Sequence, residues 1–337
     1  KSTIDTVLLH SYITNSIGIF RGKAGVSIIL FELASYLKDA SIEEHAFELL
    51  QETFVYDIDD CGLLNGKAGI SYALNYLIKS KLLEADYFKL YVKQHKEIIE
   101  KIKDLGHKQE ADETGLDYYF FINTSDYISY ADYQKYQKIV TKCILNTLEE
   151  YECSRSPADK MTFYMYITKV ISVLNNIGKT TAHNIFNKID SINNKLIQSN
   201  WECTIPLLPI QLSLYSHIYQ QKKIIKAGKK ITKEYLSTLE HSTLGLRYRI
   251  DLIIALFRLY TYDNDRDYIS MAYKLADTLI DRNIDIYEKK LAELVFTGSL
   301  IEVGLGSGLC RLLMLHIYWN RIGEGIFPSN FKELSLL

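Results

Sequence analysis

The stretch that decides the fold occurs twice: residues 18–26 read Gly-Ile-Phe-Arg-Gly-Lys-Ala-Gly-Val, and residues 62–70 read Gly-Leu-Leu-Asn-Gly-Lys-Ala-Gly-Ile. The second copy follows the first by 44 residues and keeps every glycine in register. Each copy runs into an apolar segment with helical spacing, residues 26–37 and residues 70–82. Self-similarity with a period of roughly 20–50 residues is typical of repeat architectures. The two copies therefore predict repeated glycine turns that each open a buried helix.

Weaker copies follow along the chain. A third contains Gly115, which we expect to be the last glycine of the pattern, and a seventh contains Gly304 and Gly308 in a turn that we expect to be one residue shorter. The fourth, fifth and sixth have lost the full glycine pattern and span residues 161–174, 201–214 and 245–260. Glycine lets a backbone turn tightly and lets the start of a helix approach its neighbours. We therefore expect these glycines at the starts of inner helices: Gly18, Gly22, Gly25, Gly62, Gly66, Gly69, Gly115, Gly304 and Gly308.

Amphipathic segments lie between the copies, at residues 42–54, 87–105, 133–149, 185–197, 222–239 and 268–279. Apolar helices that alternate with amphipathic ones predict two layers, with the apolar helices inside. We expect an all-α protein, an α/α toroid of about seven inner and seven outer helices in one domain over residues 1–337. The alternative is an open helical solenoid. Its middle repeats would be regular, whereas these copies differ strongly from one another.

Composition excludes several classes of function. The net charge is −2 and the basic residues are scattered, so we expect no nucleic-acid partner. No apolar run is long enough to span a bilayer, so we expect no transmembrane segment. The five cysteines are widely spaced and form no CxxC pair. This pattern argues against a disulfide framework and favours a reducing, cytoplasmic location.

The series of G-x-x-x-G-x-A-G-[I/V] turns resembles the lanthionine synthetase C-like family, over essentially the whole chain. The resemblance is strongest in the first, second and last copies. It implies an α/α toroid whose loops meet over a central cavity. There a zinc ion activates a peptide cysteine thiolate, which adds to dehydroalanine or dehydrobutyrine and closes a thioether ring. The implied ligands are the cysteine of a W-C-x-G turn and the cysteine and histidine of a C-H-G turn, with an A-H-G histidine for acid–base chemistry.

This chain departs from those turns. The W-C-x-G turn corresponds to Trp201-Glu-Cys203-Thr204, in which the cysteine has moved by one residue and the glycine is lost. The C-H-G turn falls on residues 246–248, Leu-Arg-Tyr, and the A-H-G turn on residues 161–163, Met-Thr-Phe. A catalytic zinc site needs three protein ligands. Cys203 is the one weak candidate ligand that the resemblance supplies, so we expect no metal and no other cofactor.

We interpret the chain as a family member without zinc, a non-catalytic component of a ribosomal peptide modification system. Its partner would be a precursor peptide or a modification enzyme. The alternative is an active zinc-dependent thioether cyclase that rebuilds its metal site around Cys203. A third possibility is an unrelated toroid enzyme, such as a glycosidase, with paired carboxylates. Its candidate carboxylates would be Asp59, Asp60 and Glu302.

Three positions correspond to the metal-binding histidine of the family: Arg21, Asn65 and Arg247. Because the turns of the toroid converge, we expect a binding site at the mouth of its cavity, formed by Arg21, Asn65, Asp112, Thr162, Cys203, Arg247 and Glu302. Guanidinium groups suit carboxylates and phosphates, so our hypothesis is an anionic ligand such as an acidic peptide segment. Alternatively, the two arginines only pair with acidic neighbours such as Asp60.

Overall fold

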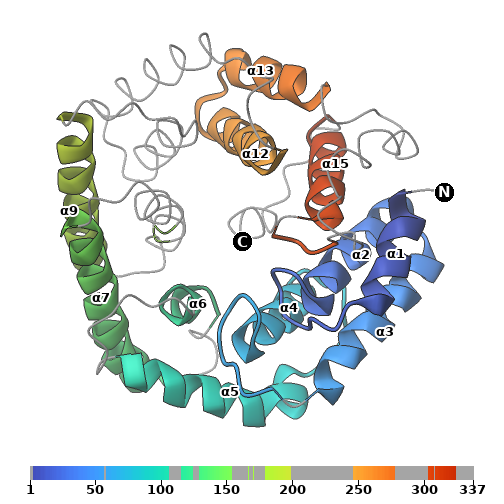
Figure 1. Ribbon diagram of the computed structural model, residues 1–337, viewed down its shortest axis with the longest axis horizontal. Coiled ribbons are helices and arrows are strands. Elements are labelled where there is room, and N and C mark those ends of the chain that lie inside the picture. Colours follow the sequence, from blue (N-terminus) through green and yellow to red (C-terminus); the bar gives the residue numbers. More distant parts are fainter. Residues whose placement is uncertain are drawn as a thin grey trace. The chain divides into compact units, whose positions relative to one another are not determined.

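The computed structural model of the chain contains only α-helices in the part that it describes (Figure 1). The described residues are 3–56, 58–105, 115–123, 129–153, 166, 170, 179–198, 246–277, 303–306 and 308–323. The chain forms two compact units. Unit 1 contains residues 1–13 and 203–335, and unit 2 contains residues 14–202 and 336–337. The prediction of an all-α protein is therefore confirmed for the described residues.

Unit 2 alternates buried and amphipathic helices. The buried helices are α2 (Lys23–Leu37), α4 (Lys67–Lys79) and α6 (Leu116–Asn123). The amphipathic helices are α3 (Ala40–Val55), α5 (Tyr87–Asp104), α7 (Tyr130–Cys153) and α9 (Lys179–Gln198). In α4 every residue from Lys67 to Leu77 is buried, whereas α3 buries only a stripe that includes Ile42, Ala46 and Leu49. The predicted alternation of apolar and amphipathic helices is confirmed here.

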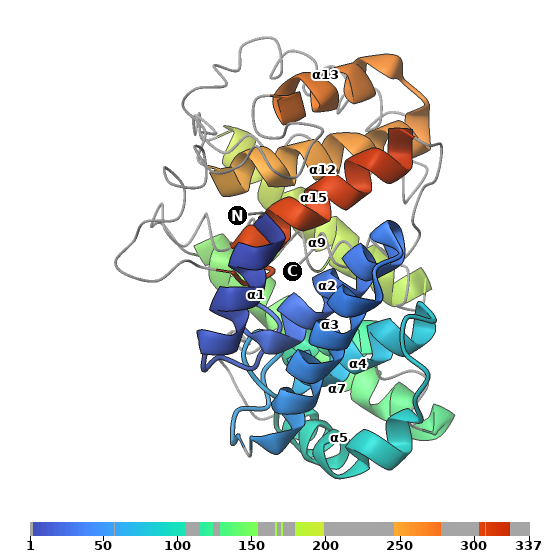
Figure 2. The ribbon, with the colours of Figure 1, turned by 90° about the vertical axis from the view of Figure 1, so that its right-hand side faces the viewer.

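The helices of unit 2 pack as two layers. Helix α2 packs on α4 and α4 packs on α6, so the buried helices follow one another. Each is covered by the amphipathic helix that follows it in the chain: α3 lies on α2, α5 on α4 and α7 on α6. Figures 1 and 2 show α2 and α3 side by side, with the elongated α5 and α7 in succession. The glycine turns stand at the starts of the inner helices.

The two layers begin their helices differently. The outer helices α3 and α5 have aspartate N-caps, and Asp39 accepts hydrogen bonds from the amides of Ser41 (2.9 Å) and Ile42 (3.4 Å). The inner helices α2 and α4 have glycine N-caps, Gly22 and Gly66, without a side-chain hydrogen bond. An aspartate cap supplies acceptors for the free first-turn amides. The inner helices instead bond these amides to the backbone of their own turns.

Unit 1 contains α1 (Thr3–Ile13), α12 (Leu246–Asp263), α13 (Arg266–Asp277) and α15 (Leu309–Gly323). Helix α12 packs on α13 and on α15, and Figure 1 shows α12 and α13 side by side. The run 252–259 of α12 is buried throughout, which agrees with the apolar sixth copy. Helix α1 was not predicted. It packs on α15, so the first helix of the chain covers the last described one.

Several expectations lie outside the described residues. The fifth copy and the amphipathic segment 222–239 fall there, and only residues 166 and 170 of the fourth copy are described. The expected numbers of inner and outer helices therefore stay a prediction.

Candidate functional site

The first two glycine turns have the same backbone hydrogen bonds. In each, the first two amides of the helix donate to the carbonyls seven residues earlier: Lys23 to Ser16 (3.0 Å), Ala24 to Ile17 (3.2 Å), Lys67 to Asp60 (2.9 Å) and Ala68 to Cys61 (3.3 Å). The carbonyl before the turn thus takes the acceptor role that a capping side chain has elsewhere. The sequence repeat is therefore a repeat of backbone geometry as well.

The seventh copy in unit 1 forms the same turn. The amide of Gly308 donates to the carbonyl of Gly304 (2.9 Å), as the amide of Gly66 does to Gly62 (3.1 Å). The amide of Cys310 donates to Val303 across the same seven residues (3.1 Å). The expectation that this turn is one residue shorter is wrong, because Gly304 and Gly308 keep the spacing of Gly62 and Gly66.

Arg311 stands in the seventh copy where the third glycine stands in the second. Its side chain is only 3% exposed, and its Nη1 donates to the carbonyl of Leu305 within the turn (3.3 Å). Leu305 is itself fully buried, as are Ile19 and Leu63 at the equivalent positions of the first two turns. The apolar residue after the first glycine thus anchors all three turns.

The first and second turns touch one another through their glycines. The amide of Phe20 donates to the carbonyl of Leu64 (2.9 Å), and a Cβ on Gly18 would lie 2.3 Å from the Cα of Asn65. A Cβ on Gly69 would lie 2.3 Å from the carbonyl oxygen of Leu63. No side chain fits at such distances, so glycine is required at position 18, where the turns meet, and at position 69, where α4 lies against its own turn.

Gly115 occupies a different place from the one expected. It directly precedes α6, and its carbonyl accepts from the amide of Tyr119 (3.0 Å). It therefore corresponds to the N-cap glycines Gly22 and Gly66, not to the last glycine of the pattern. Its φ of +72° is a left-handed conformation that favours glycine, and a Cβ would lie 3.3 Å from the side chain of Leu63. Gly115 thus lies against the second turn.

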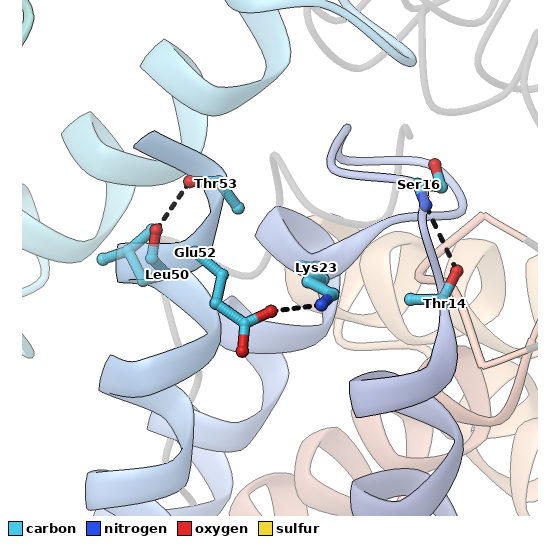
Figure 3. A network of polar contacts seen from close by, with 6 residues as sticks. All are labelled: Thr14, Ser16, Lys23, Leu50, Glu52 and Thr53. Atoms are coloured by element: carbon cyan, nitrogen blue, oxygen red, sulfur yellow. Dashed lines mark hydrogen bonds and ion pairs between the residues drawn. The ribbon is translucent and has the colours of Figure 1, made fainter. Parts of the chain in front are cut away.

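A buried lysine follows each of the first two turns. Lys23 and Lys67 are the first residues of α2 and α4 and are 4% and 8% exposed. Lys23 forms an ion pair with Glu52 of α3, toward which it points in Figure 3, and Lys67 forms one with Glu97 of α5. Each pair joins an inner helix to the outer helix that covers it. These ion pairs were not predicted from the sequence, although the repeated Gly-Lys-Ala-Gly could have indicated them.

Buried polar groups also join three helices of unit 2. The hydroxyl of Ser71 in α4 is hydrogen-bonded to the hydroxyls of Tyr87 in α5 and Tyr119 in α6, at 2.7 Å for Tyr119. The Tyr87 hydroxyl also lies 3.2 Å from Nδ1 of His95. Burial lowers the pKa of His95, so its imidazole is neutral at pH 7. The network ties both layers together around α4.

The proposed site residues are only partly described. Arg21 and Asn65 are exposed, and each precedes its inner helix by two residues in turns that pack on one another. Arg247 lies in unit 1, where it is already helical in the first turn of α12, so its backbone setting differs from theirs. The remaining proposed residues lie outside the described part of the chain: Asp112, Thr162, Cys203 and Glu302.

A pocket of about 260 Å³ lies beside the second turn. It is lined by Asp59, Asp60, Cys61, Gly62, Lys101, Asp104, Leu105 and Leu116. One carboxylate already serves the turn, because Asp60 accepts a hydrogen bond from the amide of Gly62 (2.6 Å). With three carboxylates and one ammonium group, the pocket favours cations over anions.

Cys61 in this pocket is a free thiol and only 8% exposed. Burial is the largest influence on it and raises the pKa of the thiol, although Lys67 acts in the opposite direction. Because the thiolate is the reactive form, Cys61 is a poor nucleophile at neutral pH. Its surroundings are those of a packed side chain.

Within the described ranges, no three histidine, cysteine, aspartate or glutamate side chains are grouped so as to hold a metal ion. None of the described helices combines the length and the apolar character that crossing a bilayer requires. No protein-family model and no curated protein matches the chain.

Proposed function

We propose that this chain is a lanthionine synthetase C-like protein without zinc chemistry, which binds a peptide segment or a partner protein in a ribosomal peptide modification system. The observation that carries the proposal is the repeated glycine turn. Its hydrogen bonds recur in the turns before α2, α4 and α15, at the positions on which the resemblance rests. A backbone repeat of this kind belongs to the family pattern, whereas the ligand turns of that pattern are altered.

We further propose that the helices form an α/α toroid. Two features support this arrangement. Inside unit 2 the buried helices α2, α4 and α6 follow one another beneath an outer layer. Inside unit 1, α1 packs on α15 and so gives the last inner helix an outer partner from the start of the chain. A closed ring needs such a contact between its first and last elements.

The loss of cyclase activity is proposed from the residues at the ligand positions. Residues 246–248 and 161–163 offer neither a thiol nor an imidazole where the family places them. We therefore propose that the protein, which keeps the glycine turns but not the ligand residues, binds its partner without catalysing a reaction.

For the ligand, we propose an acidic segment held by Arg21. A guanidinium group forms charge-assisted hydrogen bonds with carboxylates, and Arg21 is exposed in its turn. The acidic pocket beside the second turn repels such a segment. Arg21 would therefore hold it, rather than Asp59, Asp60 or Asp104.

The test is a titration of the full chain against a fluorescently labelled octapeptide of alternating glutamate and alanine, followed by anisotropy. We expect Arg21→Ala to weaken binding roughly tenfold, the value of one charge-assisted hydrogen bond. Arg266→Ala is the matched control, because Arg266 is an exposed arginine at the start of α13 and should leave the affinity unchanged. Equal affinities for the wild type and both variants, or no binding by the wild type, would contradict this ligand.

A further inference from the structure

A second concave surface lies at the opposite end of α2 from the glycine turn. It is a groove of about 490 Å³ between the first half of α3 and the segment that follows α4, and Phe31 of α2 also lines it. It is lined by Phe31, Ala40, Glu43, Glu44, Phe47, Lys81, Leu82, Leu83 and Glu84. Helix α2 has 15 residues and is therefore about 22 Å long at 1.5 Å per residue. The groove is thus separate from the proposed arginine site.

The groove combines an apolar wall with an acidic rim. Phe47 is 43% exposed on α3, and Leu82 and Leu83 are half-buried after α4. The rim carries exposed carboxylates from Glu43, Glu44 and Glu84, against one cation, Lys81. The three glutamates form no ion pair within the described part of the chain. This is a surface with apolar contact area and uncompensated negative charge.

Capping accounts for neither Glu44 nor Glu84, whereas Glu43 lies in the first turn of α3, where the helix dipole favours a carboxylate. Helix α3 is capped by Asp39, and α5 is capped by Asp86, which accepts from the amides of Phe88 (3.0 Å) and Lys89 (3.3 Å). The first-turn amides that a capping carboxylate would bond are therefore already satisfied on both helices. Glu44 and Glu84 have no role in either cap.

The backbone on one side of the groove is fixed. Lys81 has a left-handed φ of 57°, and its amide donates to the carbonyl of Ile78 (3.0 Å). The amides of Leu82 and Leu83 both donate to the carbonyl of Leu77, at 2.9 and 3.2 Å. These hydrogen bonds hold Leu82 and Leu83 in place before anything binds. A preformed surface loses less entropy when a ligand binds.

We propose that this groove docks a basic peptide segment in which lysines or arginines flank a large apolar side chain. The apolar side chain packs on Phe47, Leu82 and Leu83, and the flanking cations lie against Glu43, Glu44 and Glu84. Complementary charge selects the partner and speeds its association, while the buried apolar contact holds it. The inference goes beyond the proposed function, because it concerns a different surface and a ligand of opposite charge.

The test uses the full chain and a labelled peptide, Lys-Lys-Phe-Leu-Lys-Lys, with anisotropy as the readout. We expect the double variant Glu43→Lys/Glu44→Lys to bind about tenfold more weakly, since two attractions become repulsions. Phe47→Ala should weaken binding about threefold through lost apolar contact. Raising the salt from about 0.05 to 0.5 M should also lower the affinity, because exposed charges are screened.

The matched control is Glu100→Lys/Glu149→Lys, which makes the same charge change at two exposed positions outside the groove. It should bind like the wild type. Equal losses in both double variants would overturn the proposal. So would equal binding of Lys-Lys-Gly-Ser-Lys-Lys, which would make the surface a general attractor of cations. Failure of the glutamate–alanine peptide to bind would count against the arginine site alone.

Discussion

Gly69 shows most clearly what the repeated turn demands of a single residue. A Cβ there would lie 2.3 Å from the carbonyl oxygen of Leu63, and backbone atoms cannot give way as a flexible side chain can. We predict that Gly69→Ala lowers the free energy of unfolding by about 2 kcal/mol, as overpacking does elsewhere. Urea unfolding measures this. A variant as stable as the wild type would mean that the start of α4 does not lie this close to the carbonyl of Leu63.

Lys38 is a non-glycine residue at a position where glycine would be preferred. It is the C-cap of α2 with φ 57° and ψ 43°, a left-handed conformation in which glycine is the preferred residue. We predict that Lys38→Gly stabilises the protein by about 0.5–1 kcal/mol through relief of this strain. A higher melting temperature for Lys38→Gly than for the wild type is the expected result. A lower one would show that the lysine side chain contributes more than its backbone conformation costs.

For single residues, the sequence predicted the glycines at helix starts but not the lysines with a left-handed backbone. Gly22, Gly66 and Gly308 were expected at helix starts because the repeat places them before apolar segments, and they are found there. The left-handed lysines Lys38 and Lys81 could not be predicted, since nothing in a lysine indicates a positive φ. Their conformation follows from how the chain reverses after each inner helix.

Among the elements, ion pairs join the inner layer to the outer layer at the first residues of α2 and α4. Lys67 is buried, and its pairing with Glu97 lowers the pKa of that carboxyl below 4.5. A lowered folded-state pKa stabilises the protein above the unfolded value, and this contribution is lost as the pH falls through the folded value. The pair should therefore stabilise the fold at pH 7 and not under strongly acidic conditions.

We predict that Glu97→Gln destabilises the protein at pH 7 by at most about 1 kcal/mol, because water screens a carboxylate that is 37% exposed. The difference from the wild type should shrink as the pH falls below about 4.5. Melting temperatures at pH 7 and pH 3.5 measure it. The control is Glu100→Gln, whose exposed partner is Lys103. A loss for Glu97→Gln that is independent of pH would contradict the ion-pair explanation.

The sequence predicted which helices are buried and which are amphipathic, but it did not predict every helix. The alternation of buried and amphipathic helices was readable from period and polarity in α2 to α5 and in α12 and α13. Helix α1 was missed, because its exposed face also carries apolar residues, Leu9 and Ile13 at 54% exposure, which blur the pattern. The buried stripe of Thr3, Val7 and Ser11 was the available signal.

For the whole molecule, the proposed site depends on contacts between distant copies. Asn65 lies against Gly18 of the first turn because the first two turns pack on one another, and the repeat allowed that to be expected. The acidic pocket and the groove could not be predicted, since each joins segments from separate helices whose packing sets their distance. Local patterns predict elements, whereas surfaces between elements need the tertiary structure.

We propose that this chain keeps a glycine turn that resembles the lanthionine synthetase C-like family but binds no zinc. Elemental analysis of the full chain, purified with excess zinc and then dialysed, tests this, with Cys203→Ala alongside. We expect far less than one zinc per chain in both proteins, because residues 246–248 read Leu-Arg-Tyr at the position of the ligand turn. About one zinc per wild-type chain, lost in Cys203→Ala, would contradict it and restore the active cyclase.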